Sequence, residues 1–256
     1  FDFHNNLNFS HYFGNGNCFS ISDLFYLGNK NTAGTETSKD FGLQKDLNNI
    51  LTLNFIFPEI KNAFKLQTNV SWLNNNRNFT DSDENSKHFV NTIKFNVLGD
   101  LYYFEKYSQA VGLTFEFTNL DSTDDGRHVQ FKGTIKETST FRISNWFSVV
   151  IPLGFTFCNK NIAFVPKLGT KFSFTKCELL INCYRMVQFP NMDDLYWNGG
   201  GFLGNKNLKK EDGIGAELTI NTFDILLPFS FCVFSNYYKN KIQWSGKTVK
   251  NVASAF

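Results

Sequence analysis

The segment VGLTFEF at residues 111–117 decides the fold, because apolar and polar side chains alternate along it. Phe115 and Glu116 are typical neighbours: the first is aromatic and the second is charged. A period of two places alternate side chains on opposite faces of a β-strand, and no helical period competes with it here. The same period recurs in residues 64–72, 89–97, 164–174 and 214–221. The sequence therefore predicts an all-β protein.

Composition supports extended segments and argues against several functions. The chain of 256 residues contains 31 phenylalanines, which favour strands over helices. Charge is nearly balanced, with 25 Lys and Arg against 23 Asp and Glu, so nucleic acid is not an expected partner. The four histidines are scattered, the five cysteines lack zinc-ligand spacing, and no nucleophile elbow is present. We therefore expect neither an enzyme nor a bound metal or cofactor.

Alternation alone does not say which face of a strand meets water. In a soluble sandwich the apolar face points inward, whereas in a membrane barrel it points toward lipid. Connector lengths favour the barrel, because long polar connectors alternate with tight ones near 105–109 and 145–146. This interpretation gives about eleven or twelve strands. The long connectors are expected at residues 28–40, 74–86, 120–126, 186–212 and 245–250.

A second segment carries more specific information. Residues 183–211 read CYRMVQFPNMDDLYWNGGGFLGNKNLKKE, in which an aromatic-Arg pair leads into a Pro, an acidic-Leu-Tyr stretch and a Gly/Asn-rich turn. The order and spacing of these residues resemble the barrel of TonB-dependent outer-membrane receptors of the vitamin B12 and siderophore type. The resemblance is clear over residues 162–256 and generic before them. Its motif positions are Pro190, Asp194, Leu195, Gly199, Gly200, Gly204, Asn205, Leu208 and Glu211.

The resemblance implies a fold, binding partners and a cellular location. Residues 1–256 would form part of an antiparallel transmembrane β-barrel of about 22 strands in the bacterial outer membrane, in contact with outer-membrane lipid. The protein would take up a metal chelate or a cobalamin-like nutrient, driven by the TonB complex through a plug domain missing from this chain. Both ends, Phe1 and Phe256, look cut. The sequence leaves open the ligand, whether the fragment is natural or a truncated reading frame, and the strand register in residues 1–60.

The motif has an architectural interpretation and a ligand-binding one. Pro fixes φ and Gly accepts positive φ, so loop shape alone explains the Pro and the glycines. Tyr196, Trp197 and Arg185 are the candidate ligand contacts on the long-loop rim. Lys210 stands where the family usually has Pro, and Met186-Val187-Gln188 replaces its usual aromatic-Arg-small run. The ligand is therefore less well indicated than the family.

Three alternatives remain open at this point. A passive outer-membrane pore or structural barrel could be complete at about twelve strands, and a soluble all-β binding module could have the same alternation. Two Asp-rich loops offer oxygen ligands for Ca²⁺, although ordinary solvated turns are the preferred interpretation. Their acidic and amide residues are Asp81, Asp83, Glu84 and Asn85 in one loop, and Asp121, Asp124 and Asp125 in the other.

Overall fold

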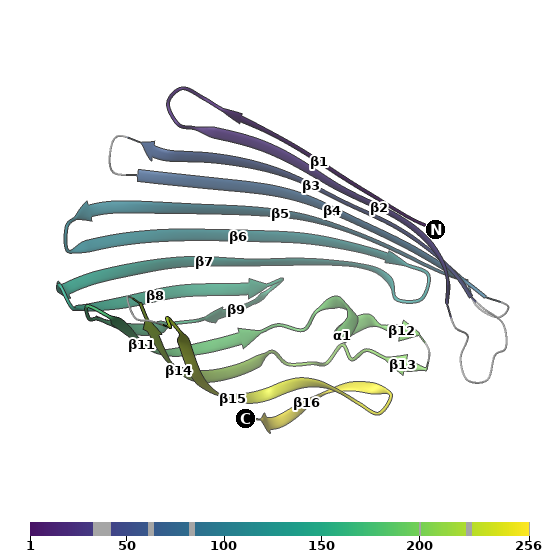
Figure 1. Cartoon of the computed structure of the whole chain (residues 1–256). Coiled ribbons are helices and arrows are strands. Elements are labelled where there is room, and N and C mark those ends of the chain that lie inside the picture. Colours follow the sequence, from purple (N-terminus) through teal and green to yellow (C-terminus); the bar gives the residue numbers. More distant parts are fainter. Residues whose placement is uncertain (33–41, 61–63, 82–84, 200, 224–226, 256) are drawn as a thin grey trace.

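One curved sheet contains all sixteen strands of the computed structural model, which describes residues 1–32, 42–60, 64–81, 85–199, 201–223 and 227–255 (Figure 1). Consecutive long strands are antiparallel neighbours from β1 to β8, and the sheet continues through β10, β11, β14, β15 and β16. The strands are β1 Asp2–Tyr12, β2 Cys18–Thr32, β3 Gly42–Ile60, β4 Phe64–Thr80, β5 Asn85–Phe104, β6 Tyr107–Ser122, β7 Gly126–Ser144, β8 Phe147–Cys158, β9 Asn161–Phe164, β10 Lys167–Ser173, β11 Cys177–Gln188, β12 Asn198–Gly199, β13 Phe202–Leu203, β14 Glu211–Thr222, β15 Ser230–Ser245 and β16 Thr248–Ala255.

The predicted all-β class is confirmed, and the predicted strand number is slightly low. Strands β9 and β10 pair with β8 in the same register, and they are separated only at Val165 and Pro166. Pro166 has no backbone N–H to donate to the ladder, which explains the interruption. Counting β9 with β10 and leaving out the two-residue strands β12 and β13 gives thirteen long strands in the described residues, against an expected eleven or twelve.

The two faces of the sheet differ in polarity, as the period of two predicts. We call the face that bears Lys94 and Glu116 the inner face, and the opposite face, which bears Phe95 and Phe115, the outer face. The inner face has a ladder of neutral polar side chains across four strands. In this ladder the Asn54 amide donates to Ser20, the Asn69 amide to Asn54 and the Asn96 amide to Asn69, at 3.2, 2.6 and 3.2 Å.

The outer face is an apolar band with polar limits. Asn49, Asn74, Asn91 and Asn119 are successive cross-strand partners on β3 to β6, and they form the limit on the long-loop side. On the opposite side the Gln109 amide donates to the Glu137 carboxylate at 3.0 Å. The ten residue steps from 109 to 119 span about 33 Å along an extended strand, which is about 25 Å at the tilt usual in membrane barrels. The apolar band therefore has the height of an outer-membrane hydrocarbon core.

Several connectors are shorter than expected: residues 28–32 belong to β2, and the long connector expected at 120–126 is the three-residue turn 123–125 between β6 and β7. Residues 74–80 belong to β4 rather than to a long loop, because its asparagines pair in register with β3 and β5; the Asn74 amide also donates to the Asn91 side chain at 2.8 Å. The long connector expected at 245–250 is a tight turn at Gly246 and Lys247, with Gly246 at φ +63°. The tight turns at 105–106 and 145–146 are as expected, and residues 33–41 lie outside the described part of the chain.

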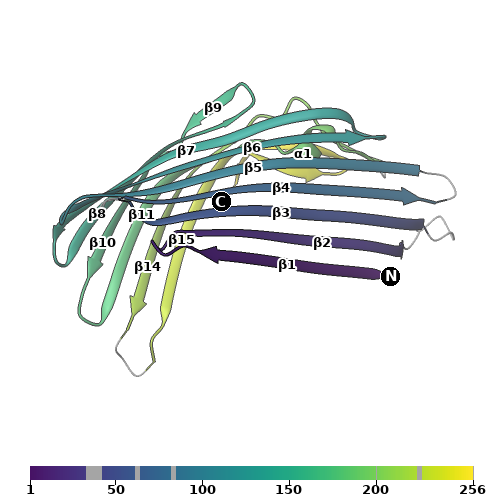
Figure 2. The same cartoon turned by 90° about the horizontal axis from the view of Figure 1, so that it is seen from above.

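The sheet is open along β1, whose residues are all exposed (Figures 1 and 2). Among the described strands, β1 pairs only with β2, and the far end of the sheet is formed by β16, β13 and β12. A complete twelve-stranded pore would require its first and last strands to pair, so the structure does not support that alternative. The open edge is a row of unpaired backbone groups.

The described residues contain no helix long and apolar enough to cross a membrane. One short helix, α1 Met192–Tyr196, lies in the long connector between β11 and β14, beside β12 and β13. In Figure 1 this connector lies between β7 and the pair β15–β16. Strand β7 begins at Gly126, whereas its pairing with β8 begins only at Lys132. The first residues of β7 therefore have no strand beside them on the β8 side, and the connector can lie there.

Candidate functional site

The connector 189–210 is a self-bonded loop rather than a loose excursion. Asn191 caps α1: its side chain accepts from the Asp194 backbone N–H at 2.7 Å, while the Asp194 carboxylate accepts from the Asn191 N–H at 3.0 Å. Farther along the loop, the Asn205 N–H donates to the Asp194 carbonyl at 2.8 Å. These bonds close the loop on itself and satisfy the amide groups at the start of the helix.

Gly204 is required at its position because no side chain fits there. A Cβ at Gly204 would lie 2.7 Å from the Leu195 carbonyl carbon and from the Tyr196 nitrogen. Its own N–H donates to the Trp197 carbonyl at 2.7 Å. The start and the end of the loop therefore touch through backbone alone, as a tight fold-back needs.

Other motif residues attach the loop to neighbouring strands. The Asn205 amide donates to the Val249 carbonyl at 3.0 Å, and the Glu211 carboxylate accepts from the Ile242 N–H at 2.7 Å. The Pro190 carbonyl accepts from the Gln130 amide of β7 at 3.2 Å. Leu208 donates its N–H to the Asn205 carbonyl, and the Gly199 carbonyl accepts from the Trp197 indole. Each of these residues has an architectural role; Gly200 lies outside the described residues.

The loop lies against the inner face of β5 and β7, on the side chains nearest the rim. The Tyr196 ring stacks on the His128 ring of β7, with centroids 3.5 Å apart and planes inclined by 7°. The Trp197 ring is parallel to the His88 ring of β5, with centroids 6.3 Å apart. Both histidines lie on the same face as Lys94 and Glu116. We call the group of His88, His128, 124–125 and 193–198 the rim site.

Hydrogen bonds join the loop to the turn between β6 and β7. The Asn198 backbone N–H donates to the Asp125 carboxylate at 2.8 Å, and its side-chain amide donates to the Asp124 carbonyl at 3.2 Å. His88 lies 3.5 Å from the Asp124 carboxylate, 3.7 Å from the Asp125 carboxylate and 2.9 Å from the Ser122 hydroxyl. The rim site therefore combines aromatic rings with carboxylates that already have partners.

Asp193 is the residue of the rim site with a perturbed acidity. Packing of the loop around its carboxyl raises the pKa of Asp193, and the negative charges of Asp125 and Asp194 raise it further. The nearby His88 opposes this shift. Protonation of Asp193 therefore occurs at a higher pH than for an ordinary aspartate.

A cavity of about 460 Å³ opens beside the loop, lined by Tyr196, Trp197, Asp124, Asp125 and residues 203–207. Lys206 lies 5.6 Å from the centroid of the Tyr196 ring, so that ring already has two partners. Trp197 keeps 38% of its surface exposed. Of the three candidate ligand contacts, the cavity contains Tyr196 and Trp197.

Arg185, the third candidate ligand contact, lies on the opposite face of the sheet from the rim site. It belongs to the outer face of β11, where its guanidinium donates to the Asp212 carboxylate at 2.8 and 2.5 Å and to the Phe164 carbonyl at 3.0 Å. The structure therefore separates Arg185 from the two aromatic residues. Sequence reasoning missed His88 and His128, because only strand register brings them beside the loop.

In the described part of the chain, no group of three or more His, Cys, Asp or Glu side chains is placed to hold a metal ion. Asp121 pairs with Arg127 at 3.1 Å, and Asp124 and Asp125 are engaged by His88 and Asn198. Residues 82–84 of the other Asp-rich loop lie outside the described residues.

Comparison with known proteins supports the fold and leaves the ligand open. No protein-family model and no curated protein matches the sequence. Solved structures do match: the Serratia marcescens hemophore receptor HasR in complex with its hemophore HasA and heme shares 10% identity, with a TM-score of 0.77 over 96% of this chain and 48% of its own. The FrpB iron transporter from Neisseria meningitidis shares 11% identity, with a TM-score of 0.77 over 97% of this chain and 48% of the transporter chain. The siderophore receptor PirA from Pseudomonas aeruginosa shares 13% identity, with a TM-score of 0.59 over 97% of this chain and 56% of the PirA chain.

These similarities confirm the resemblance to TonB-dependent receptors as far as the fold is concerned. They extend over almost the whole chain, including residues before 162, for which the sequence alone offered only strand alternation. The chain spans about half the length of the solved structures it matches. The fold is thus that of part of a receptor barrel.

Proposed function

We propose that this chain, with the fold of a TonB-dependent receptor barrel, is part of a bacterial outer-membrane receptor that takes up a small-molecule metal chelate. The observation that supports this best is the inward placement of the loop 189–210. The loop carries Trp197 and Tyr196 to the inner face at the rim, above an inner wall of polar side chains. An exposed aromatic ring at the mouth of a polar lumen suits capture of a ligand from outside.

The class of ligand follows from the rim site. Trp197 offers an exposed ring, and the carboxylates of the 124–125 turn and the Lys206 ammonium offer polar groups around the same cavity. Such a mixed lining suits a flat or ring-containing chelate with polar substituents. The solved structures with this fold include a hemophore receptor bound to heme, an iron transporter and a siderophore receptor. We extend this proposal to siderophore, heme or cobalamin-like chelates as candidate ligands.

The proposed partners are outer-membrane lipid and the TonB complex. The outer face exposes large apolar side chains such as Ile93 at 52% and Ile214 at 64%, which suits a hydrocarbon environment. The inner ladder of Ser20, Asn54 and Asn69 offers hydrogen bonds without net charge to a folded plug domain. Energy from TonB would reach the barrel through that plug. Enzyme chemistry and nucleic-acid binding form no part of this proposal.

The experiment combines membrane insertion with ligand binding. The purified full chain would be inserted into lipid vesicles, and binding of a ferric siderophore, heme and cobalamin would be measured by equilibrium dialysis. We expect saturable binding of one of them, weakened at least about tenfold by Trp197→Ala, because exposed aromatic anchors dominate binding sites. Trp146→Ala, in the turn of the opposite rim, is the matched control and should leave the affinity unchanged.

Two results would contradict the proposal. A chain that stays in the aqueous phase without vesicles or detergent would exclude the membrane barrel. An inserted chain that binds none of the three ligands, or that binds one equally well without Trp197, would exclude uptake through the rim site.

A further inference from the structure

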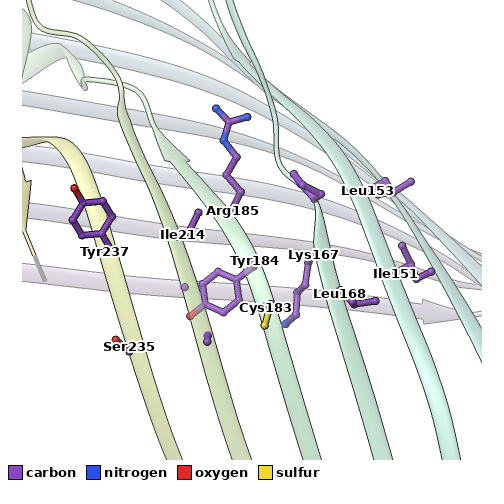
Figure 3. A pocket seen from close by; sticks show the side chains of 13 residues that line it. Ile151, Leu153, Lys167, Leu168, Cys183, Tyr184, Arg185, Ile214, Ser235 and Tyr237 are labelled. Carbon is purple, nitrogen blue, oxygen red and sulfur yellow. The ribbon is translucent and has the colours of Figure 1, made fainter.

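A hollow on the outer face of the sheet takes no part in the proposed uptake. Its volume is about 720 Å³, and strands β8, β10, β11, β14 and β15 line it (Figure 3). Its floor consists of the small side chains of Cys183, Ala216 and Ser235, which are direct cross-strand partners on β11, β14 and β15. Small residues at these three positions leave the hollow between larger neighbours.

The walls of the hollow are largely apolar, and Lys167 and Arg185 are its charged lining residues. Ile151, Leu153 and Leu168 stand on one side, and Ile214 and Tyr237 stand on the other (Figure 3). Leu153, Leu168 and Ile214 are exposed by 42%, 53% and 64% in the isolated chain. A surface of this kind within a hydrocarbon layer accommodates acyl chains, because an acyl chain can fill a hollow that the neighbouring side chains leave empty.

The end of the hollow nearest the loops is basic. Arg185 lies there, held by Asp212 and by the Phe164 carbonyl, and Lys239 is the cross-strand partner of Asp212. Lys210 precedes β14 by one residue. Lys210 and Lys239 also lie close enough for their charges to act on the Asp212 carboxylate. Arg185 and these two lysines therefore give the end of the hollow nearest the loops an excess of positive charge.

We infer that this hollow binds one phosphate-bearing membrane lipid, with an acyl chain over Cys183, Ala216 and Ser235 and the anionic headgroup beside Arg185 and Lys239. The inference rests on the proposed function, because it takes the outer face to lie in a bilayer. Charge complementarity selects an anionic lipid, since an arginine and lysines near the headgroup attract its phosphate while the apolar side chains of the walls attract the acyl chain. Zwitterionic lipids lack the net charge that the basic end selects.

Spin-labelled lipids provide the test. The full chain would be inserted into phosphatidylcholine vesicles, and the motionally restricted fraction of labelled phosphatidylglycerol would be compared with that of labelled phosphatidylcholine at low salt. We expect a preference of about fivefold for phosphatidylglycerol, the size that one basic residue near a headgroup confers. Ala216→Trp should fill the floor and abolish the preference. Ile220→Trp, on the same face of β14 but outside the hollow, should keep it.

A charge variant separates the headgroup from the chain. Lys239→Gln should reduce the preference for phosphatidylglycerol, whereas Lys160→Gln, in the β8–β9 turn, should not. Equal restriction of both lipids in an inserted chain, or an Ala216→Trp variant that keeps the preference, would overturn the lipid site and leave the receptor proposal intact. Disulfide-linked dimers through Cys183, observed without any motionally restricted lipid, would assign the hollow to a second copy of the chain. That result would also overturn the lipid site. Failure of the chain to enter vesicles would overturn the proposed function and, with it, this site.

Discussion

Tyr196 and His128 stack face to face with ring centroids 3.5 Å apart, although they are 68 positions apart in the chain. The tyrosine ends α1 and the histidine lies near the start of β7, so this contact attaches the rim loop to the wall. The Asn198 to Asp125 hydrogen bond attaches the same loop two residues later. The position of the rim site depends on these two attachments.

Removal of the stacking ring should loosen the loop. Aromatic pairs contribute about 0.5–1.5 kcal/mol of stability beyond the burial of their surface. We therefore expect His128→Ala to raise the fraction of molecules whose loop is detached from the sheet about two- to tenfold. Limited proteolysis within residues 189–210 measures that fraction. His11→Ala, at the exposed end of β1, is the control. An unchanged cleavage rate in His128→Ala would show that the stack does not hold the loop.

The close backbone approach at Gly204 gives a sharper prediction. A Cβ there would meet backbone atoms of Leu195 and Tyr196 at 2.7 Å, so Gly204→Ala must displace the loop, at a cost of about 1–3 kcal/mol. A Cβ at Gly199 would meet only the Trp197 ring at 3.7 Å, which is ordinary contact. We expect Gly204→Ala to increase proteolysis in the loop and to reduce ligand affinity, and Gly199→Ala to do neither. Equal behaviour of the two variants would contradict this account.

Sequence reasoning predicted the strands and the rim loop better than it predicted the site. Period-two alternation in 111–117 and its repeats is a local signal, and it correctly gave an all-β sheet with two unlike faces. The polar run 74–78 was wrongly predicted as a loop, since asparagine is depleted in strands and only cross-strand partners such as Asn91 stabilise it there. The proximity of His88 and His128 to Trp197 and Tyr196 depends on strand register, which no single segment encodes. The face on which Arg185 lies likewise depends on that register.

The raised pKa of Asp193 predicts how the loop responds to pH. The Asp193 carboxyl takes up a proton more readily in the docked loop than in a released one. Its contribution to docking is therefore fully present below the ordinary aspartate pKa, and it is lost as the pH rises through the raised pKa of the docked loop. We expect proteolysis of the loop to increase with pH over the mildly acidic range. The rate would be normalised to cleavage of an unfolded substrate. Asp193→Asn should remove this part of the pH dependence, and an identical profile for the variant would refute the assignment.

The orientation of the wall can be tested with two neighbouring residues of β6. Leu113 faces outward in the middle of the apolar band, whereas Thr114 faces inward near Glu116 and Lys132. An arginine on the lipid face near the bilayer midplane costs about 2–4 kcal/mol, so Leu113→Arg should sharply lower the yield of folded chain in vesicles. Thr114→Arg adds the same charge to the polar inner face beside the Glu116 carboxylate, and we expect a yield close to that of the unmodified chain. The yield would be measured as the fraction resistant to external protease. If Thr114→Arg were instead the variant that fails to insert, the inner and outer faces would be reversed, and both the lipid hollow and the inward rim site would be assigned to the wrong side of the sheet.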